Sequence, residues 1–425
     1  MRVTVDVDVR HLTRVEGHGN IRIRVRDGVL EEARWEVVET PRFFEVMLKG
    51  KHYTTAGILT SRICGICSIG HCLASVRATE AAFGVRVPEL AARLRLLAKH
   101  GETLQSHALH VLFLAAPDFL GLESAIPLVE RNPELFAVAT RLRGAGNTLC
   151  DVVAGRTTHP VSISVGGMAR RPDKRLLRGV RGELEGALQD LRAVVDLVRG
   201  FEVLPFSRET EFVSLLGTGS YPWIGGRLVS SDGVEMAESD YARMANEYVT
   251  DEDTSKWCRL SRPSFAVGAL ARFNNGSRLL HPAAREVAAE LGLRAPCHNP
   301  FMNSVAQVVE MVHVTQECLT LLDEVLDAPA DAPLAAAVEP RAGEGVGAVE
   351  APRGILYHHY AYDDAGRIVK ANCVIPTTQN NANIHLDLRQ LALEQARLGT
   401  TDAALERLAS MLVRSYDPCI SCSVH

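Results

Sequence analysis

Two cysteine pairs, one near each end of the chain, constrain the fold more than any other part of the sequence. The first lies in Arg62-Ile-Cys64-Gly-Ile-Cys67-Ser-Ile-Gly-His71 and the second in Asp417-Pro-Cys419-Ile-Ser-Cys422-Ser-Val-His425. A two-residue gap lets both sulfurs of a pair turn to one side of a tight loop or helix start. Four such thiolates suit one soft-metal site. We therefore expect the fold to bring the two ends of the sequence together.

The residues alone leave the identity of the metal open. The pairs of a structural zinc knuckle usually lie within one small module, which these widely separated pairs do not. A four-cysteine iron–sulfur cluster would take the same four ligands and stays an alternative. The other six cysteines are isolated, and a lone cysteine is usually a small buried hydrophobic residue; they are Cys72, Cys150, Cys258, Cys297, Cys318 and Cys373.

Composition and charge indicate a globular protein. The 425 residues are 47% hydrophobic and 23% charged, with a formal net charge of −5. The absence of a Lys/Arg-rich block argues against nucleic-acid binding. No apolar run approaches the roughly 18–20 residues of a membrane span, and the start of the sequence lacks the apolar core of a signal peptide. We therefore expect a cytoplasmic protein with reduced cysteines.

The predicted fold class is α+β and mainly α, with long helices that form a core bundle. Alternating residues predict strands at 3–9, 20–26 and 29–38, which form a small antiparallel sheet within an N-terminal β-layer, 1–40. A mainly helical body follows over 41–326, with a mixed, turn-rich segment at 203–280. Helical periodicity predicts helices at 72–83, 88–115, 134–153, 173–199, 282–291, 303–326, 384–397 and 402–415.

The rest of the chain is predicted to be a connection and a metal-binding segment. Residues 327–352 are rich in Ala, Pro and Gly and are interpreted as a surface connection. Residues 353–425 contain a predicted hairpin, 354–362 with 367–374, and the second cysteine pair. Because the two pairs must meet, residues 1–425 are expected to form one domain.

The two cysteine motifs resemble the paired signatures of nickel–iron hydrogenase large subunits, R-x-C-G-x-C-x-x-x-H and D-P-C-x-x-C-x-x-H. Four further segments match in the family's order: Arg14-Val-Glu16-Gly-His18, Gly155-Arg-Thr-Thr-His159-Pro160, Ala351-Pro-Arg353-Gly and Pro376-Thr-Thr-Gln-Asn-Asn381. The resemblance implies a nickel–iron centre on Cys64, Cys67, Cys419 and Cys422. Cys67 and Cys422 would bridge to an iron that carries carbon monoxide and cyanide.

The resemblance also implies roles for the residues around the centre. Glu16 would move protons beside Cys419, because heterolytic cleavage of H2 needs a base close to the metals. Arg353 would donate to one cyanide and polarise H2, with Asp118 and Asp417 holding its guanidinium. Further residues complete the implied surroundings: Pro376 and Thr377 at the other cyanide, His71 as a donor to a bridging thiolate, and His159 as a structural histidine beside Arg156.

A second, hard metal ion is implied near residue 425. In the family the last histidine of this motif binds a divalent ion, Mg²⁺ in many members, together with a glutamate and a backbone carbonyl. The matching positions are His425, Glu45 and the carbonyl of Cys373. Oxygen ligands and water suit such an ion.

The implied function is that of a hydrogenase catalytic subunit, which cleaves H2 reversibly into protons and electrons. No third cysteine cluster is present to carry electrons onward. We therefore expect a heterodimer with an iron–sulfur small subunit, within a larger electron-transfer complex of the cytoplasmic group. One alternative is a regulatory H2 sensor with the same centre. Another is a relative of the quinone-module subunit of respiratory complex I, although that subunit has lost the cysteine ligands.

Overall fold

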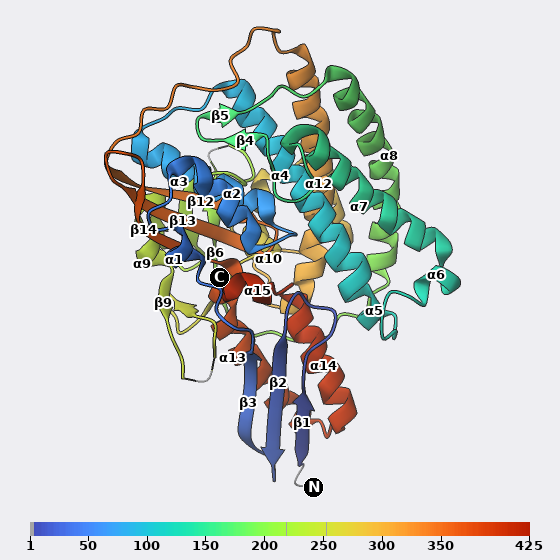
Figure 1. Ribbon diagram of the computed structural model, residues 1–425. Coiled ribbons are helices and arrows are strands. Elements are labelled where there is room, and N and C mark those ends of the chain that lie inside the picture. Colours follow the sequence, from blue (N-terminus) through green and yellow to red (C-terminus); the bar gives the residue numbers. More distant parts are fainter. Residues whose placement is uncertain (1–3, 218, 252) are drawn as a thin grey trace.

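The fold joins a large helical body to a small sheet that projects from one end. The computed structural model in Figure 1 describes residues 4–217, 219–251 and 253–425, so the first residue of the predicted 3–9 strand lies outside the described residues. The α+β, mainly helical prediction is confirmed. Within the described residues, no helix combines the length and apolar character needed to cross a membrane.

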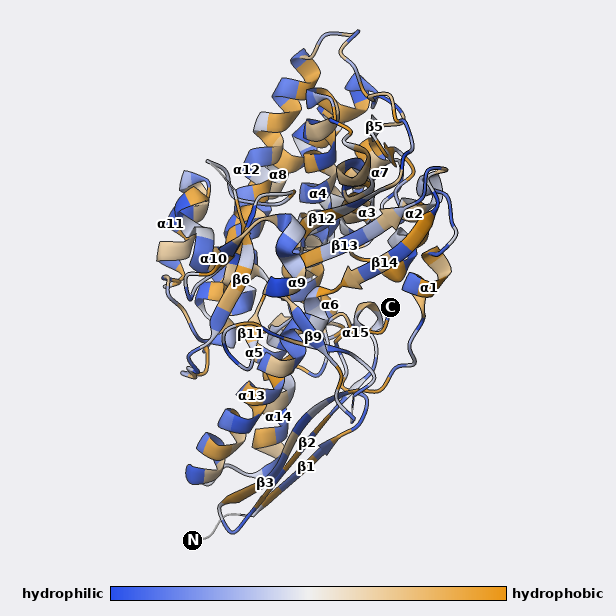
Figure 2. Ribbon diagram, turned by 90° about the vertical axis from the view of Figure 1, so that its left-hand side faces the viewer, coloured by the Kyte–Doolittle hydropathy of each residue, from blue (hydrophilic) through white to orange (hydrophobic). Residues whose placement is uncertain are grey.

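The N-terminal sheet forms as predicted, with strands β1 (Val5–Val9), β2 (Gly19–Arg26) and β3 (Val29–Val37) in antiparallel order. Alternate residues of β2, such as Ile21, Ile23 and Val25, are fully buried. In Figures 1 and 2 the sheet lies beside α13 (Pro376–Arg397) and α14 (Asp402–Ser415), both of which carry hydrophobic and hydrophilic residues. The sheet thereby attaches the N-terminal segment to the C-terminal part of the chain.

Long helices form the body, and α4 lies at its centre. It packs against α7 and α12, while α8 packs against the same two helices (Figure 1). Leu94, Leu97 and Leu104 on α4 are buried, as the helical periodicity predicts. The helices are α3 (Ser68–Phe83), α4 (Glu89–Leu109), α7 (Pro133–Ala154), α8 (Lys174–Arg199) and α12 (Asn303–Asp327).

Shorter helices connect and cap these elements. The helix predicted at 88–115 is α4 followed by a π-helical turn over His110–Ala115. The helix predicted at 384–397 begins eight residues earlier, at Pro376, because the buried side chains of its first turns are polar and do not show hydrophobic periodicity. The remaining helices are α1 (Phe44–Leu48), α2 (Tyr53–Thr60), α5 (Ala116–Phe119), α6 (Leu128–Arg131), α9 (Tyr241–Met244), α10 (Ala269–Gly276), α11 (Pro282–Glu290) and α15 (Ile420–Ser423).

Among the described residues, four further sheets lie within the body. The turn-rich segment at 203–280 contains a sheet in the order β11-β6-β7-β8 and the pair β9–β10, and a small hairpin is formed by β4 and β5. The predicted hairpin forms as β13 (Gly354–Tyr362) and β14 (Ile368–Val374). The other strands are β4 (Ile163–Ser164), β5 (Gly167–Met168), β6 (Glu211–Leu216), β7 (Arg227–Ser230), β8 (Glu235–Met236), β9 (Asn246–Tyr248), β10 (Trp257–Arg259) and β11 (Phe265–Ala266).

The surface connection predicted at 327–352 is wrong for residues 343–351. These form β12 (Gly343–Ala351), which pairs with β13 and packs against α3. Three alternate glycines allow this approach. A Cβ atom on Gly343, Gly345 or Gly347 would lie 2.3–2.6 Å from backbone carbonyl oxygens of α3. The glycines therefore allow close strand-to-helix packing, whereas composition alone made them resemble a flexible linker.

Replacing Gly345 with Ala should destabilise the fold, because its Cβ would lie 2.3 Å from both Ala78 O and Ala82 N. Overpacking of this kind costs about 1–3 kcal/mol of unfolding free energy, measured by chemical denaturation. The matched control is Gly182→Ala at an exposed position of α8, where the new Cβ meets nothing within 4 Å. That change should raise the free energy of unfolding by about 0.5–1 kcal/mol, because alanine favours the helix more than glycine does. Equal stability of the two variants would contradict the assigned packing of β12.

Candidate metal centre

The sulfur atoms of Cys64, Cys67, Cys419 and Cys422 converge at one buried point. All four lie within 4.8 Å of one another. Cys64 Sγ is 3.6 Å from Cys419 Sγ, and Cys67 Sγ is 3.7 Å from Cys422 Sγ. The meeting of the two ends of the chain, expected from the sequence, is therefore present.

The first pair lies in the loop that leads into α3. Cys64 follows a short 3-10 turn, Ser61–Ile63, and Cys67 is the N-cap residue of α3. The backbone N–H groups of Ile66 and Cys67 each donate to Cys64 Sγ at 3.3 Å. This turn points both sulfurs inward while Gly65 stays exposed.

The second pair is held by the N-terminal segment. Glu16 and Cys419 form a parallel β-bridge, and Ile420 N donates to Glu16 O at 2.9 Å. Arg42 N also donates to Val424 O at 2.7 Å, and the Arg42 guanidinium donates to Ser421 O. Residues before the first pair thus position the last residues of the chain.

The cluster is electrostatically suited to a cation. Burial raises the pKa of Cys419 and Cys422 well above the usual value. The pKa of Cys64 is lowered because its sulfur accepts hydrogen bonds from the Cys419 and Cys422 thiols. Several buried thiolates cannot coexist without positive charge, and a thiophilic metal supplies it while displacing the protons. The donor set therefore fits a nickel–iron centre.

A small cavity beside the sulfurs is lined by donors that point to a further group there. Arg353, 4% exposed, contributes to its lining together with Thr377 and His71. Arg353 Nε donates to Asp417 O at 2.7 Å, yet its buried Nη1 has no hydrogen-bond partner. The Thr377 hydroxyl accepts from Cys419 N at 2.9 Å, so its own proton is free for another acceptor. Acceptor ligands on a metal would satisfy these donors.

Only one of the two aspartates expected beside Arg353 contacts it. Asp417 Oδ1 lies 2.9 Å from the Arg353 guanidinium, whereas Asp118 pairs with Arg14 at 2.5 Å and with Arg414 at 2.8 Å. Asp118 follows the π-helical turn after α4, which directs it toward the N-terminal segment and α14. The prediction that Asp118 holds Arg353 is therefore wrong.

The residue that does support Asp417 was missed. Gln307 Nε2 donates to Asp417 Oδ2 at 3.2 Å, and its Oε1 lies 2.5 Å from His110 Nδ1. Gln307 is a helical residue of α12 in no recognisable motif. It lies among other buried polar residues of α12, such as Asn303 and Glu310, and no sequence pattern distinguishes it from them.

Two histidines flank the first cysteine pair. His71 contributes to the cavity lining, and its Nδ1 lies 3.2 Å from His358 Nε2. Burial lowers the pKa of His71 to about 3, so the ring is neutral. His159 connects the two sides of the Cys64–Cys67 loop, since its N–H donates to Ser68 Oγ and its Nδ1 bonds to Ser61 O, both at 2.9 Å.

Glu16 is in direct contact with the second pair. Its Oε2 lies 3.1 Å from Cys419 Sγ and accepts from Ser421 N at 3.1 Å, while its Oε1 accepts from the Ser421 hydroxyl. Glu16 is half-buried, so the residue that contacts Cys419 Sγ also reaches the protein surface.

Glu45 and His425 lie together close to the cluster, with His425 Nε2 3.5 Å from Glu45 Oε1. Cys373 contacts Glu45 through its N–H, which donates at 2.8 Å. Burial raises the pKa of Glu45, but the hydrogen bond and charge of His425 outweigh it and leave the pKa below its usual value. The carboxylate is therefore ionised, as a cation ligand must be.

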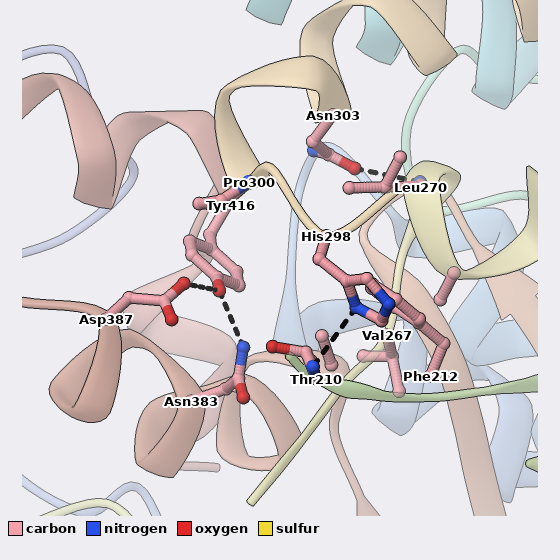
Figure 3. Close-up of a pocket in the computed structure, with 12 residues that line it drawn as sticks. Thr210, Phe212, Val267, Leu270, His298, Pro300, Asn303, Asn383, Asp387 and Tyr416 are labelled. Carbon is pink, nitrogen blue, oxygen red and sulfur yellow. Dashed lines mark hydrogen bonds between the residues drawn. The ribbon is translucent and has the colours of Figure 1, made fainter. Parts of the chain in front are cut away.

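A separate cavity lies behind Tyr416, the residue before Asp417 (Figure 3). Tyr416 Oη donates to Asp387 at 2.5 Å and accepts from Asn383 Nδ2 at 2.7 Å. His298 Nδ1 accepts from Thr210 N at 3.1 Å on the other side of this cavity. The contacts of Tyr416 therefore attach the residue before Asp417 to α13.

Comparison with known proteins agrees with this geometry. The family model of nickel-dependent hydrogenases matches residues 42–140 and 243–425. The sulfhydrogenase 2 subunit alpha of Pyrococcus furiosus is 32% identical over 422 residues, covering 99% of this chain and 98% of that protein. The NAD-reducing hydrogenase HoxS subunit beta of Cupriavidus necator is 29% identical over 462 residues, covering 97% of this chain and 93% of that protein.

The same result comes from a solved structure. The crystal structure of an NAD+-reducing [NiFe]-hydrogenase in the H2-reduced state superposes with a TM-score of 0.88, at 30% identity and with full coverage of both chains. With the buried four-cysteine cluster, these matches show that the chain belongs to the nickel-dependent hydrogenases, as a catalytic large subunit that acts on H2.

Proposed function

We propose that this chain catalyses reversible heterolytic cleavage of H2 at a nickel–iron centre held by Cys64, Cys67, Cys419 and Cys422, with carbon monoxide and cyanide on the iron. The observation that carries the proposal is the meeting of four buried sulfurs, one of them in contact with Glu16. When bound, the centre supplies the electron-poor metal at which H2 is polarised and its electrons are accepted.

Glu16 takes the proton released at the centre. Its carboxylate is within hydrogen-bond distance of Cys419 Sγ, at 3.1 Å, so a proton on that sulfur can pass directly to Oε2. The Ser421 hydroxyl and N–H hold the carboxylate in this orientation. Because Glu16 is half-buried, it can then release the proton toward water.

Arg353 and Thr377 would hold the cyanides by hydrogen bonds. The unpartnered Nη1 of Arg353 and the free hydroxyl proton of Thr377 are donors in the cavity beside the sulfurs, and cyanide nitrogen is an acceptor. Asp417 fixes the Arg353 guanidinium, and Pro376 starts the helix that carries Thr377. His71 stands beside Cys67 and Cys422 in the same cavity lining.

A divalent cation, Mg²⁺ by preference, is proposed at Glu45 and His425, with the Cys373 carbonyl as third protein ligand. The supporting observation is the 3.5 Å approach of His425 to ionised Glu45 close to the thiolate cluster. Glu247 and Lys256, 3.1 Å apart, provide further charge close by. The hydrated ion would anchor the end of the second cysteine segment.

Electrons leave through a partner, proposed to be an iron–sulfur small subunit that forms a heterodimer with this chain. Within the described residues, the thiolate cluster is the only group of three or more His, Cys, Asp or Glu side chains arranged to hold one metal ion, so no second cysteine cluster is present to accept the electrons. The Cys64–Cys67 loop reaches the surface at Gly65, next to exposed Arg62. Ile58 and Val161, 59% and 56% exposed, line a cavity there with Arg62. We propose docking at this face, within a larger cytoplasmic electron-transfer complex.

Cys64→Ser should reduce nickel in the purified protein at least about tenfold, because even loss of a group that supports a ligand costs that much affinity. The control is Cys72→Ser, a buried cysteine of α3 whose thiol pKa burial raises to about 12 and which lies outside the cluster. Its nickel content should match the wild type. Nickel retained by the Cys64 variant, or stoichiometric zinc in the wild type, would contradict the proposed centre.

Glu16→Gln should lower H+/H2 isotope exchange by about 10²–10⁴-fold, because the amide cannot carry the proton. Infrared bands of iron-bound CO and CN⁻ should stay, since the residue lies beside one sulfur only. The control is Glu39→Gln, which changes a carboxylate bonded to His18 and should leave exchange unchanged. Full exchange in the Glu16 variant would remove it from the proton route, whereas bands without turnover in the wild type would indicate an H2 sensor.

A further inference from the structure

Arg272, in α10, is a fully buried arginine with every donor in use. Its side chain has 0% exposure. Two of its N–H groups donate to the carbonyl oxygens of Ala351 and Pro352, each at 3.0 Å. These are the two carbonyls immediately before Arg353. The guanidinium is therefore attached to the backbone that presents Arg353 to the centre.

Two carboxylates from different elements hold this guanidinium in place. Glu310 of α12 accepts from Nε and Nη2 at 2.7 and 2.6 Å, and Glu350 of β12 accepts from Nη1 at 2.9 Å. With the two carbonyls, these contacts use all five N–H donors of an arginine. The ring of Trp223 covers the guanidinium, whose central carbon Cζ lies 5.1 Å from the ring centroid.

The segment held by Arg272 is the buried turn between β12 and β13. Ala351 pairs with Gly354, so Pro352 and Arg353 form the two-residue turn between β12 and β13. Gly354 has a φ of 135°, which a residue with a Cβ rarely adopts. Rotation of this turn would move the Arg353 side chain away from the cavity. Asp417 contacts only the guanidinium of Arg353 and does not hold its backbone.

We propose that Arg272 is a positioning residue for Arg353, and that it sets where the Arg353 guanidinium stands at the metal centre. The inference rests on the proposed function and adds a residue that does not touch the cavity. Arg272 acts through the Ala351 and Pro352 carbonyls. Glu310 and Glu350 fix the orientation of its guanidinium. An arginine is required because lysine offers one point charge and cannot span two carboxylates and two carbonyls.

The decisive variant is Arg272→Lys, which keeps the charge and releases at least one carbonyl. A second buried arginine provides a matched control. Arg95, 4% exposed, pairs with Glu80 at 2.6 Å and donates to two backbone carbonyls, Ser164 O at 2.7 Å and Gly167 O at 3.1 Å. Those carbonyls belong to the β4–β5 hairpin and not to the turn at Arg353. Arg95→Lys therefore removes a comparable set of guanidinium hydrogen bonds at a site away from the turn.

The holoenzyme with its partner is measured for thermal stability, H2-oxidation turnover and infrared cyanide bands. Both variants should unfold at lower temperature than the wild type. Only Arg272→Lys should displace the cyanide bands and lower turnover roughly 10–100-fold, because small misplacements at a reacting centre are costly. Unmoved bands in Arg272→Lys, or equal displacement in Arg95→Lys, would overturn the positioning role.

Glu350→Gln provides the test if Arg272→Lys does not fold. It keeps the Glu310 clamp and weakens one contact of Arg272, so the cyanide bands should move in the same direction by less. No displacement in this variant would also overturn the inference. A wild type without cyanide bands would overturn the proposed centre itself, whereas normal wild-type bands that no variant moves would overturn only the role of Arg272.

Discussion

The mutual repulsion of buried thiolates is the constraint on which the rest of the structure depends. Four sulfurs within 4.8 Å of one another cannot all be charged in a dry interior unless a cation lies between them. The protein must therefore bring the two pairs together by backbone contacts that tolerate this repulsion. The Glu16–Cys419 bridge and the Arg42 contacts do so from the N-terminal side, and α3 does so from the body.

The second determinant is the direct contact of β12 with α3. Helix α3 starts immediately after Cys67, and β12 ends at Ala351, two residues before Arg353. Because glycines face the helix, the strand lies on it without intervening side chains. The buried Arg272–Glu310–Glu350 group then fixes the turn at the end of the strand. Replacing such a buried ionic group by apolar residues often costs little stability, whereas removing one partner alone is strongly destabilising.

Sequence reasoning found what contiguous motifs encode and missed what the tertiary fold creates. The cysteine pairs, Glu16 and the Arg353–Asp417 contact were predictable because each belongs to a short recognisable segment. Asp118 was assigned to the wrong arginine, because a π-helical turn changes its direction and no sequence pattern marks such a turn. Gln307 and Arg272 are single polar residues on helices, and their importance depends on neighbours remote in sequence. The glycines of β12 were mistaken for a linker because composition does not distinguish flexibility from close packing.

The packing of β12 on α3 also limits how such a subunit can be recombined. At Gly343, Gly345 and Gly347 the strand backbone lies against the helix backbone, with no side chain whose size could absorb a mismatch. A helix with a different curvature would separate the two or shift the register. In a chimeric large subunit, residues 68–83 and 343–351 should therefore come from the same parent, although more than 250 residues lie between them in the sequence.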